Sequence, residues 1–186
     1  MKIISDKLLS KSAYTAEMDA PIASIDIAEW LFHLPEAEYL RCCPPDHIGS
    51  GITTTDDGRP MVINVEMIGT GLVIQHYIAE EATAHYCRMN SISDVFTPVG
   101  RTQVNVIWEL SAEAIEGGRA RYTNSVTSHP TDVFMDFIAA HGQSFEQAAA
   151  ARQEAGGDHN RRETPLFAAS IARRAIARSQ AKSQAK

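Results

Sequence analysis

The chain has 186 residues, of which 44% are hydrophobic and 22% charged, and its formal net charge at pH 7 is −6. This composition is typical of one globular domain with a sizeable core, and the longest apolar runs are far shorter than the roughly 20 residues that a membrane span needs. No secretory signal is visible at the N-terminus, so we expect a cytoplasmic protein without a membrane partner.

The charges are distributed unevenly along the sequence. Seven basic residues and one acidic residue lie from residue 161 onward, which leaves ten basic and twenty-two acidic residues before it. Such an acidic body repels a polyanion and argues against a nucleic-acid partner. The last eight residues repeat Ser-Gln-Ala-Lys and have little apolar surface to bury. We therefore predict a single domain over residues 1–178 and a disordered basic tail over 179–186.

The N-terminal part predicts a strand followed by a short helix. Residues 12–19 alternate loosely between apolar and polar side chains, which favours a strand. Ser24 has the side chain of a helix N-cap, and the apolar residues that follow predict a helix over 25–32. Leu34-Pro35 ends this helix, because the residue before proline disfavours the helical conformation.

Six further strand-like runs follow and predict an antiparallel meander. They cover residues 47–55, 61–68, 72–79, 83–93, 102–112 and 119–127. Asp56-Asp57-Gly58-Arg59 joins the first two as a hairpin turn, since aspartate and glycine tolerate a positive φ. In residues 102–112 the alternation is clearest.

The C-terminal part predicts helix in several pieces. Pro130 can occupy the first position of a helix, and Gly142 can interrupt it. Residues 145–155 have high helix propensity. Gly156-Gly157-Asp158 predicts a break, after which the helical pattern resumes over 163–178.

A sheet of this size must cover its apolar face, so we expect it to curl around the last helical region. The predicted fold class is α+β: a curved seven-stranded antiparallel sheet wrapped around the C-terminal helix or helices, with a short helix after the first strand. The chain resembles the START-like superfamily in three features. They are the order of one strand, a helix and six strands, the segment Met18-Asp19-Ala20-Pro21, and the segment Val106-Ile107-Trp108-Glu109-Leu110. These helix-grip or SRPBCC proteins include birch-pollen-allergen proteins and polyketide cyclases. The resemblance covers about residues 12–178, although family members commonly end in one long helix.

The resemblance implies a cavity between sheet and helix that binds a small apolar or aromatic molecule. Strand alternation and the apolar stripe of the last helix predict which residues face it. The candidates are Asn64, Glu66, Ile74, His76, Trp108, Tyr122, Asn124 and Phe167. For Asn64 and Glu66 the alternation also allows the opposite phase. Each polar candidate could instead be a hydrogen-bonded core residue, and Trp108 plain core.

His159 and Glu163 form the most specific local motif. On a helix they are at i and i+4 and share one face. Two such side chains could hold a divalent metal such as zinc, with further ligands from the strands. Candidates for these ligands are His76, Glu66 and Glu109. The pair is similar to the His-x-x-x-Glu pair on a late helix of the phloroglucinol-cleaving carbon–carbon hydrolases, which are metal-dependent members of the same superfamily.

The alternative for this motif is structural. Asp158 or Asn160 would cap a helix, and Glu163 would favour its positive N-terminal end. Because only one pair of residues has ligand spacing, the sequence favours this alternative and predicts no cofactor.

Three functions from different classes fit the sequence. The leading interpretation is a protein that binds a small apolar or aromatic molecule in an internal cavity, with cyclase or aromatase activity as an extension of that binding. The second is a metal-dependent hydrolase that uses His159 and Glu163. The third is a protein-interaction module without a small ligand. Whether the chain is an enzyme, and whether it forms a homodimer, stays open at this stage.

Overall fold

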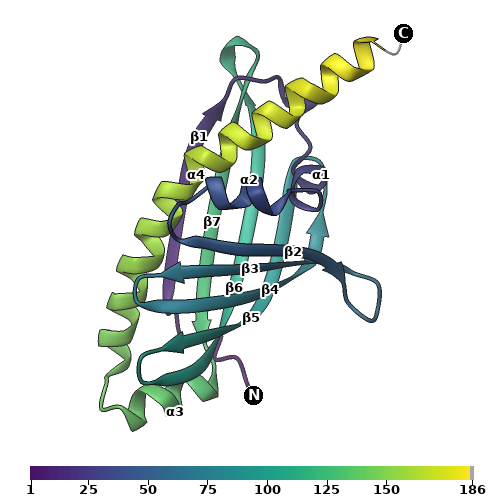
Figure 1. Ribbon diagram of the computed structural model, residues 1–186. Coiled ribbons are helices and arrows are strands. Elements are labelled where there is room, and N and C mark those ends of the chain that lie inside the picture. Colours follow the sequence, from purple (N-terminus) through teal and green to yellow (C-terminus); the bar gives the residue numbers. More distant parts are fainter. Residues whose placement is uncertain (185–186) are drawn as a thin grey trace.

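The computed structural model describes residues 1–184 and consists of one antiparallel sheet with a long helix lying across it (Figure 1). The seven strands lie in the order β1-β7-β6-β5-β4-β3-β2. Their bounds are β1 (Ser10–Met18), β2 (His47–Thr54), β3 (Pro60–Ile68), β4 (Gly71–Ala82), β5 (Tyr86–Thr97), β6 (Gly100–Ile115) and β7 (Arg119–Pro130). The fold class predicted from the sequence is confirmed.

The helical elements precede β2 and follow β7, apart from one turn. They are a 3-10 turn (Ile22–Ser24), α1 (Ile27–Leu31), α2 (Glu36–Arg41), a second 3-10 turn (Glu116–Gly118), α3 (Asp132–Ala140) and α4 (Phe145–Gln184). The predicted cap of the first helix was wrong. Asp26 caps α1 and accepts a hydrogen bond from the Glu29 N–H at 3.0 Å, whereas Ser24 closes the preceding turn by donating to Pro21 O. Helix α2 was not predicted.

Helix α4 is continuous, in contrast to the pieces that the sequence predicted. Ser144 and Gln147 begin it with a reciprocal capping box: Ser144 Oγ accepts from the Gln147 N–H, and Gln147 Oε1 accepts from the Ser144 N–H. The predicted break at Gly156-Gly157-Asp158 was wrong, because the helix runs through it for 40 residues in all. Each helical glycine costs about 1 kcal/mol relative to alanine, a cost that packing of the inward face offsets.

The end of α4 also differs from the sequence prediction. The helix includes residues 179–184, for which the sequence predicted a disordered tail. Alanine, glutamine and lysine are strong helix formers, so they can extend a helix that packing has already nucleated. Residues 185–186 lie outside the described part of the chain.

The core lies between α4, the N-terminal helices and the concave face of the sheet. α4 packs mainly along β1 and also contacts β7 and β3. Buried apolar side chains from every layer meet there, among them Trp30, Met89, Leu110, Phe167 and Ile171. On β6 the alternation predicted for residues 102–112 is confirmed, and Trp108 faces inward. Within residues 1–184, none of the helices combines the length and apolar character needed to cross a membrane.

Candidate metal centre

Four ionisable side chains from β2, β3 and α4 converge under the helix. We call His47, Glu66, His159 and Glu163 the four-residue cluster; all four are at most 5% exposed. His47 Nε2 lies 3.3 Å from Glu163 Oε2 and 3.7 Å from Glu66 Oε1. His159 Nε2 lies 3.4 Å from Glu163 Oε2 and 3.6 Å from Glu66 Oε2. Two imidazoles and two carboxylates therefore direct their ligand atoms at one small volume.

These distances match the spacing of ligands around a tetrahedral metal ion. Zinc binds histidine nitrogen and carboxylate oxygen at about 2.0–2.1 Å, which puts tetrahedral ligand atoms about 3.3–3.4 Å apart. The four nitrogen-to-oxygen distances, 3.3 to 3.7 Å, are at or slightly above that value. The residues present fit a zinc ion in both donor type and spacing.

A β-bulge directs His47 into the cluster. Along β2, Ser50 pairs with Asn64 and Ile52 with Val62, and both partners on β3 are buried. Strict alternation from Ser50 would turn His47 to the opposite face. The register shifts between His47 and Gly49, so that His47 instead pairs with Glu66. Bulges commonly re-aim a side chain beside a functional site, and this one puts an imidazole opposite a carboxylate.

The other two members come from the middle of α4. Because α4 begins at Phe145, His159 and Glu163 lie on the buried face of an established helix. Asp158 and Asn160 therefore do not cap a helix, and the capping role that the sequence favoured for them was wrong. Asp158 instead forms ion pairs with Arg161 and Arg162 on the outer side of the helix.

Hydrogen bonds fix the orientation of both imidazoles. His47 Nδ1 donates to the Tyr39 carbonyl oxygen at 2.7 Å, and His159 Nδ1 donates to Asp46 Oδ2 at 2.9 Å. A carbonyl or carboxylate oxygen can only accept, so each Nδ1 carries a proton and each Nε2 faces the cluster. Metal-ligating histidines almost always have such a partner on the other ring nitrogen.

The two carboxylates are held in the same way. The Tyr39 hydroxyl donates to Glu66 Oε1. Asn124 Nδ2 donates to Glu163 Oε1 at 3.0 Å, and Asn124 Oδ1 accepts from Trp108 Nε1 at 2.7 Å. The Asn124 hydrogen bond occupies Glu163 Oε1, so Oε2 is the oxygen that contacts the two ring nitrogens.

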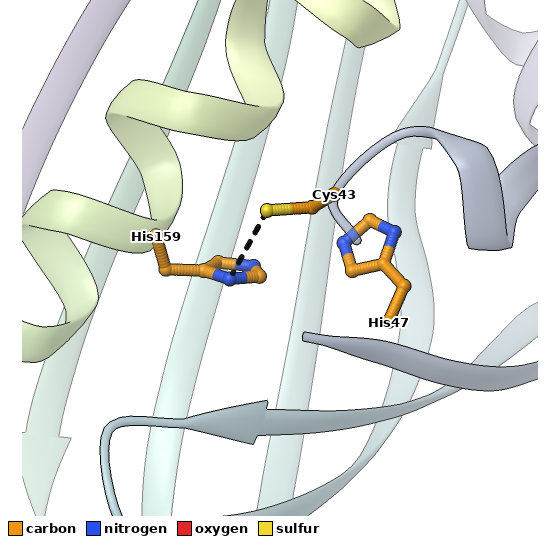
Figure 2. A group of neighbouring side chains, drawn as sticks. All are labelled: Cys43, His47 and His159. Atoms are coloured by element: carbon orange, nitrogen blue, oxygen red, sulfur yellow. Dashed lines mark hydrogen bonds between the residues drawn. The ribbon is translucent and has the colours of Figure 1, made fainter. Parts of the chain in front are cut away.

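Cys43 adds a thiol beside the cluster. Figure 2 shows Cys43, from the loop after α2, with its sulfur directed at His159, and His47 on the neighbouring segment. Cys43 Sγ lies 3.8 Å from His159 Nδ1 and accepts from Arg162 Nη1 at 3.3 Å. Cys43 Sγ contacts His159 Nδ1, the same nitrogen that contacts Asp46. This nitrogen is on the side of the ring away from the cluster, so the thiol supports the ring from outside.

The two carboxylates of the cluster favour positive charge between them. Burial opposes protonation of His159, but Glu163 outweighs it and raises the pKa of His159 to about 12. Burial likewise opposes ionisation of Glu163, yet His159 and His47 lower its pKa to about 2. The pKa of His47 is raised as well, because Glu163 and Glu66 outweigh desolvation. Without a metal the imidazoles must supply the positive charge, which a divalent ion would supply instead.

A small cavity adjoins the cluster. Its volume is about 30 Å³, room for about two water molecules. Glu66, His159 and Glu163 form part of its wall. The rest comes from Ser10, Ser12, Asn64, Ile68, Gln75, Tyr77, Trp108, Val126, Arg152, Gly156 and Asn160. The cluster is therefore open to a space inside the protein.

Several predicted cavity residues lie at this site. Asn64, Glu66 and Trp108 line the cavity, and Asn124 contacts the cluster through Glu163. Phe167 is buried one helical turn beyond Glu163, with its ring 5.7 Å from that of His47. All of these residues face inward, which for Asn64 and Glu66 decides between the two phases that the sequence left open; their role in binding a ligand stays a prediction.

Other predicted residues lie elsewhere. On β4 the predicted phase was wrong: Val73, Gln75 and Tyr77 face inward, whereas Ile74 and His76 are on the opposite face. Both faces of β4 carry aliphatic residues, so hydrophobicity could not distinguish them. Tyr122 is buried but does not line the cavity.

Of the strand residues proposed as further ligands, Glu66 joins the cluster and Glu109 does not. Glu109 instead accepts from the Tyr86 hydroxyl. The sequence analysis missed His47, Asp46 and Tyr39. The one signal for His47 was that the predicted hairpin places it near Glu66 on the neighbouring strand. The bulge shifts the pairing by one residue, so the hairpin alone does not give the contact.

Comparisons with known proteins support the fold. The structure is similar to the Zhui aromatase/cyclase from Streptomyces sp. R1128, with a TM-score of 0.61 and 13% sequence identity over 91% of this chain and 94% of that one. It is also similar to the di-domain ARO/CYC BexL from the BE-7585A biosynthetic pathway, with a TM-score of 0.53 and 11% identity over 93% of this chain and 52% of that one. No protein-family model and no curated protein matches the chain.

The chain therefore has the predicted helix-grip fold and shares it with these two aromatase/cyclases. Identities this low carry the fold and not the activity, because one scaffold hosts many functions. The function has to be argued from the four-residue cluster and its cavity.

Proposed function

We propose that the protein is a zinc-dependent hydrolase whose metal ligands are His47, Glu66, His159 and Glu163. The observation that carries this proposal is the convergence of two Nε2 atoms and two carboxylates, 3.3 to 3.7 Å apart, in a buried site. Buried ionisable groups are rarely retained in such density without a metal or a catalytic role.

Two features favour a catalytic over a purely structural ion. Structural zinc sites are closed, whereas catalytic ones keep a position open for water or substrate. Here three of the four ligands line a cavity. The four ligands are also of the imidazole and carboxylate type, although the Cys43 thiol lies close enough to His47 and His159 to form a second group of possible ligands with them.

The bound ion would supply a Lewis acid for a carbonyl oxygen and a source of nucleophilic water at neutral pH. The protein's own residues would position the substrate. Trp108 and Tyr77, with ring centroids 5.0 Å apart, form an aromatic wall of the cavity. Burial raises the pKa of Tyr77 well above its usual value, so its hydroxyl is protonated and can donate a hydrogen bond.

We propose an acylated aromatic ring as the substrate, since the cavity combines an aromatic wall with polar side chains. The His159 and Glu163 pair is similar to that of the phloroglucinol-cleaving hydrolases, which makes monoacetylphloroglucinol the first compound to test. Its hydrolysis breaks the bond between ring and acyl carbon; water supplies a hydroxyl to the acyl group and a proton to the ring, giving phloroglucinol and acetate.

Metal analysis tests the first half of the proposal. We expect close to one zinc per chain in the wild type after reconstitution and dialysis, and background zinc in His159→Ala and Glu163→Gln. His141→Ala and Glu154→Gln, which change exposed residues outside the site, are the matched controls and should retain zinc. A reconstituted wild type without zinc would refute the metal centre.

Product analysis tests the second half. We expect the zinc-loaded wild type to release acetate from monoacetylphloroglucinol, and the activity to vanish with a chelator and return with zinc. Glu163→Gln should be inactive while folded, as judged by circular dichroism. Stoichiometric zinc without hydrolysis of any acylated phenol would make the ion structural and the hydrolase assignment wrong.

A metal-free role is the second candidate, because the cavity also has the aromatic wall expected for binding or cyclisation of an aromatic molecule. That function requires no zinc. It would be favoured if an aromatic ligand co-purified with the protein and bound equally well to the wild type and to Glu163→Gln.

A further inference from the structure

Arg152 differs from the other arginines of α4. Its guanidinium lines the cavity and makes no hydrogen bond or ion pair with any residue in 1–184. By contrast, each of the following α4 arginines forms an ion pair with a carboxylate: Arg161, Arg162, Arg173, Arg174 and Arg178. Arginine stays protonated in proteins, so a positive charge faces the cavity beside the proposed zinc site; it is attracted to Glu66 across the cavity but forms no direct ion pair with it.

Neighbouring polar groups also lack partners. Within the described chain, the amide oxygens of Asn64 and Gln75 are buried without a hydrogen bond, although both side chains line the same cavity and are at most 4% exposed. A buried polar atom without a partner is costly. Both oxygens are acceptors, so a donor such as a ligand hydroxyl would satisfy them, whereas the guanidinium of Arg152 needs an acceptor oxygen.

The spacing along α4 connects this group to the cluster. Arg152, Gly156, His159 and Glu163 follow one face of the helix, and seven residues separate Arg152 from His159, about 10 Å along the axis. A Cβ added at Gly156 would meet no heavy atom of the described residues within 4 Å. The space between Arg152 and His159 is therefore not filled by a side chain.

We propose that Arg152 binds an anionic oxygen of an aromatic substrate, so that the substrate of the proposed hydrolase is an organic anion. The inference rests on the proposed function, because it assigns the substrate class of that same site. A guanidinium forms two parallel hydrogen bonds to a carboxylate, and the amide oxygens of Asn64 and Gln75 can accept from a hydroxyl of the same molecule. The anion is thereby held at one end of the cavity and the reacting group at the cluster.

The cavity must widen for an aromatic ring, since its present volume of about 30 Å³ corresponds to about two waters. Arg152 is partly exposed although burial desolvates its guanidinium, and no ion pair within residues 1–184 fixes it. Its side chain can therefore move aside for a ring and return to contact the anionic group.

Benzoate and benzamide test the proposal, because they share a shape and differ in charge. Binding is measured by calorimetry and by Trp108 fluorescence, on both zinc-loaded and metal-free protein. We expect the wild type to prefer benzoate about tenfold or more, as is usual for a charge-assisted hydrogen bond. Arg152→Gln should abolish the preference, and Arg152→Lys should restore part of it. Arg161→Gln, the same change on the outer face of α4, should leave it intact.

Three results would overturn the inference. One is the absence of saturable benzoate binding to the wild type. Another is a preference that survives in Arg152→Gln, which would place the carboxylate on the ion or elsewhere. The third is that Arg152→Gln tightens zinc binding without altering the preference, because Arg152 would then only balance the charge of Glu66. An Arg152-dependent preference in a protein that binds no zinc would support the anion site and refute the hydrolase.

Discussion

The inward face of α4 has two stretches of opposite character. From residue 152 to 164 it presents mostly polar side chains, namely Arg152, His159, Asn160, Glu163 and Thr164. From 167 to 175 it presents mostly apolar ones, namely Phe167, Ala168, Ile171, Ala172 and Ala175, and its buried polar residue Ser170 accepts a hydrogen bond from Trp30 Nε1. Both stretches lie on the same helix against the same sheet, yet only the second resembles an ordinary core.

This contrast separates stability from function within one element. An apolar contact stabilises in proportion to the area it buries, whereas a buried ionic group must recover its desolvation cost from its partners. Asn160 and Thr164 are satisfied by Ser12 Oγ and the Asn160 carbonyl oxygen. The cluster carboxylates, by contrast, are paired with imidazoles that are themselves buried. We infer that the apolar stretch holds the helix on the sheet and that the polar stretch is maintained for chemistry.

The largest effect should come from the apolar stretch. Ile171 is 1% exposed, and removal of a buried aliphatic side chain leaves a cavity, so Ile171→Ala should lower the free energy of unfolding by about 2–5 kcal/mol. Denaturant titration measures this. Ile176→Ala, an exposed position on the same helix, should cost far less. Zinc affinity should be unchanged in both, and a loss of zinc in Ile171→Ala would show that the two stretches are not independent.

A smaller effect is expected from the outer partner of a ligand in the polar stretch. Asp46→Asn keeps the size of the side chain but removes the carboxylate that accepts from His159 Nδ1. Loss of such a partner typically weakens metal binding 10- to 100-fold, or about 1.4–2.7 kcal/mol. Competition with a zinc chelator measures the affinity. Asp158→Asn is the matched control, since within residues 1–184 Asp158 pairs with Arg161 and Arg162 and contacts no proposed ligand; equal affinity in both variants would contradict the role of Asp46.

Much of the fold could be predicted because local signals agree with it. The hairpin at Asp56-Asp57-Gly58-Arg59 and the alternation on β6 depend on neighbours in sequence, and both are confirmed. Where local signals conflict with packing, the prediction failed. The glycine pair at 156–157 favours a break, but a helix packed along β1 can carry two unfavourable residues.

The site was predictable only in part. His159 and Glu163 share a helix face, so their spacing alone reveals them. His47 depends on a one-residue bulge, and a one-residue slip turns every side chain to the other face. Asp46 is more than 100 residues away in sequence from His159, the residue whose Nδ1 it contacts. Tyr39 contacts His47 through its backbone carbonyl oxygen, which every residue type has. No period or motif encodes such a partnership, which only the folded chain reveals.

The smallest effect concerns the charges beside the apolar stretch, which lie at its outer edge. Burial disfavours ionisation of Glu38, but hydrogen bonds from Arg41 and Arg173 outweigh it and lower its pKa to about 2. A carboxylate with a lowered pKa stabilises the fold above its unfolded pKa of about 4.3, and the contribution disappears as the pH falls through the folded pKa. Solvent screens these pairs, so Glu38→Gln should cost about 1 kcal/mol at pH 7. The difference from wild type should shrink between about pH 5 and pH 2.

Glu154→Gln, at an exposed residue without an ion pair in the described chain, should show no such pH dependence in urea titrations. A Glu38→Gln cost that is constant with pH would mean that the charge of Glu38 does not stabilise this edge, and that the apolar contacts alone hold the second half of α4.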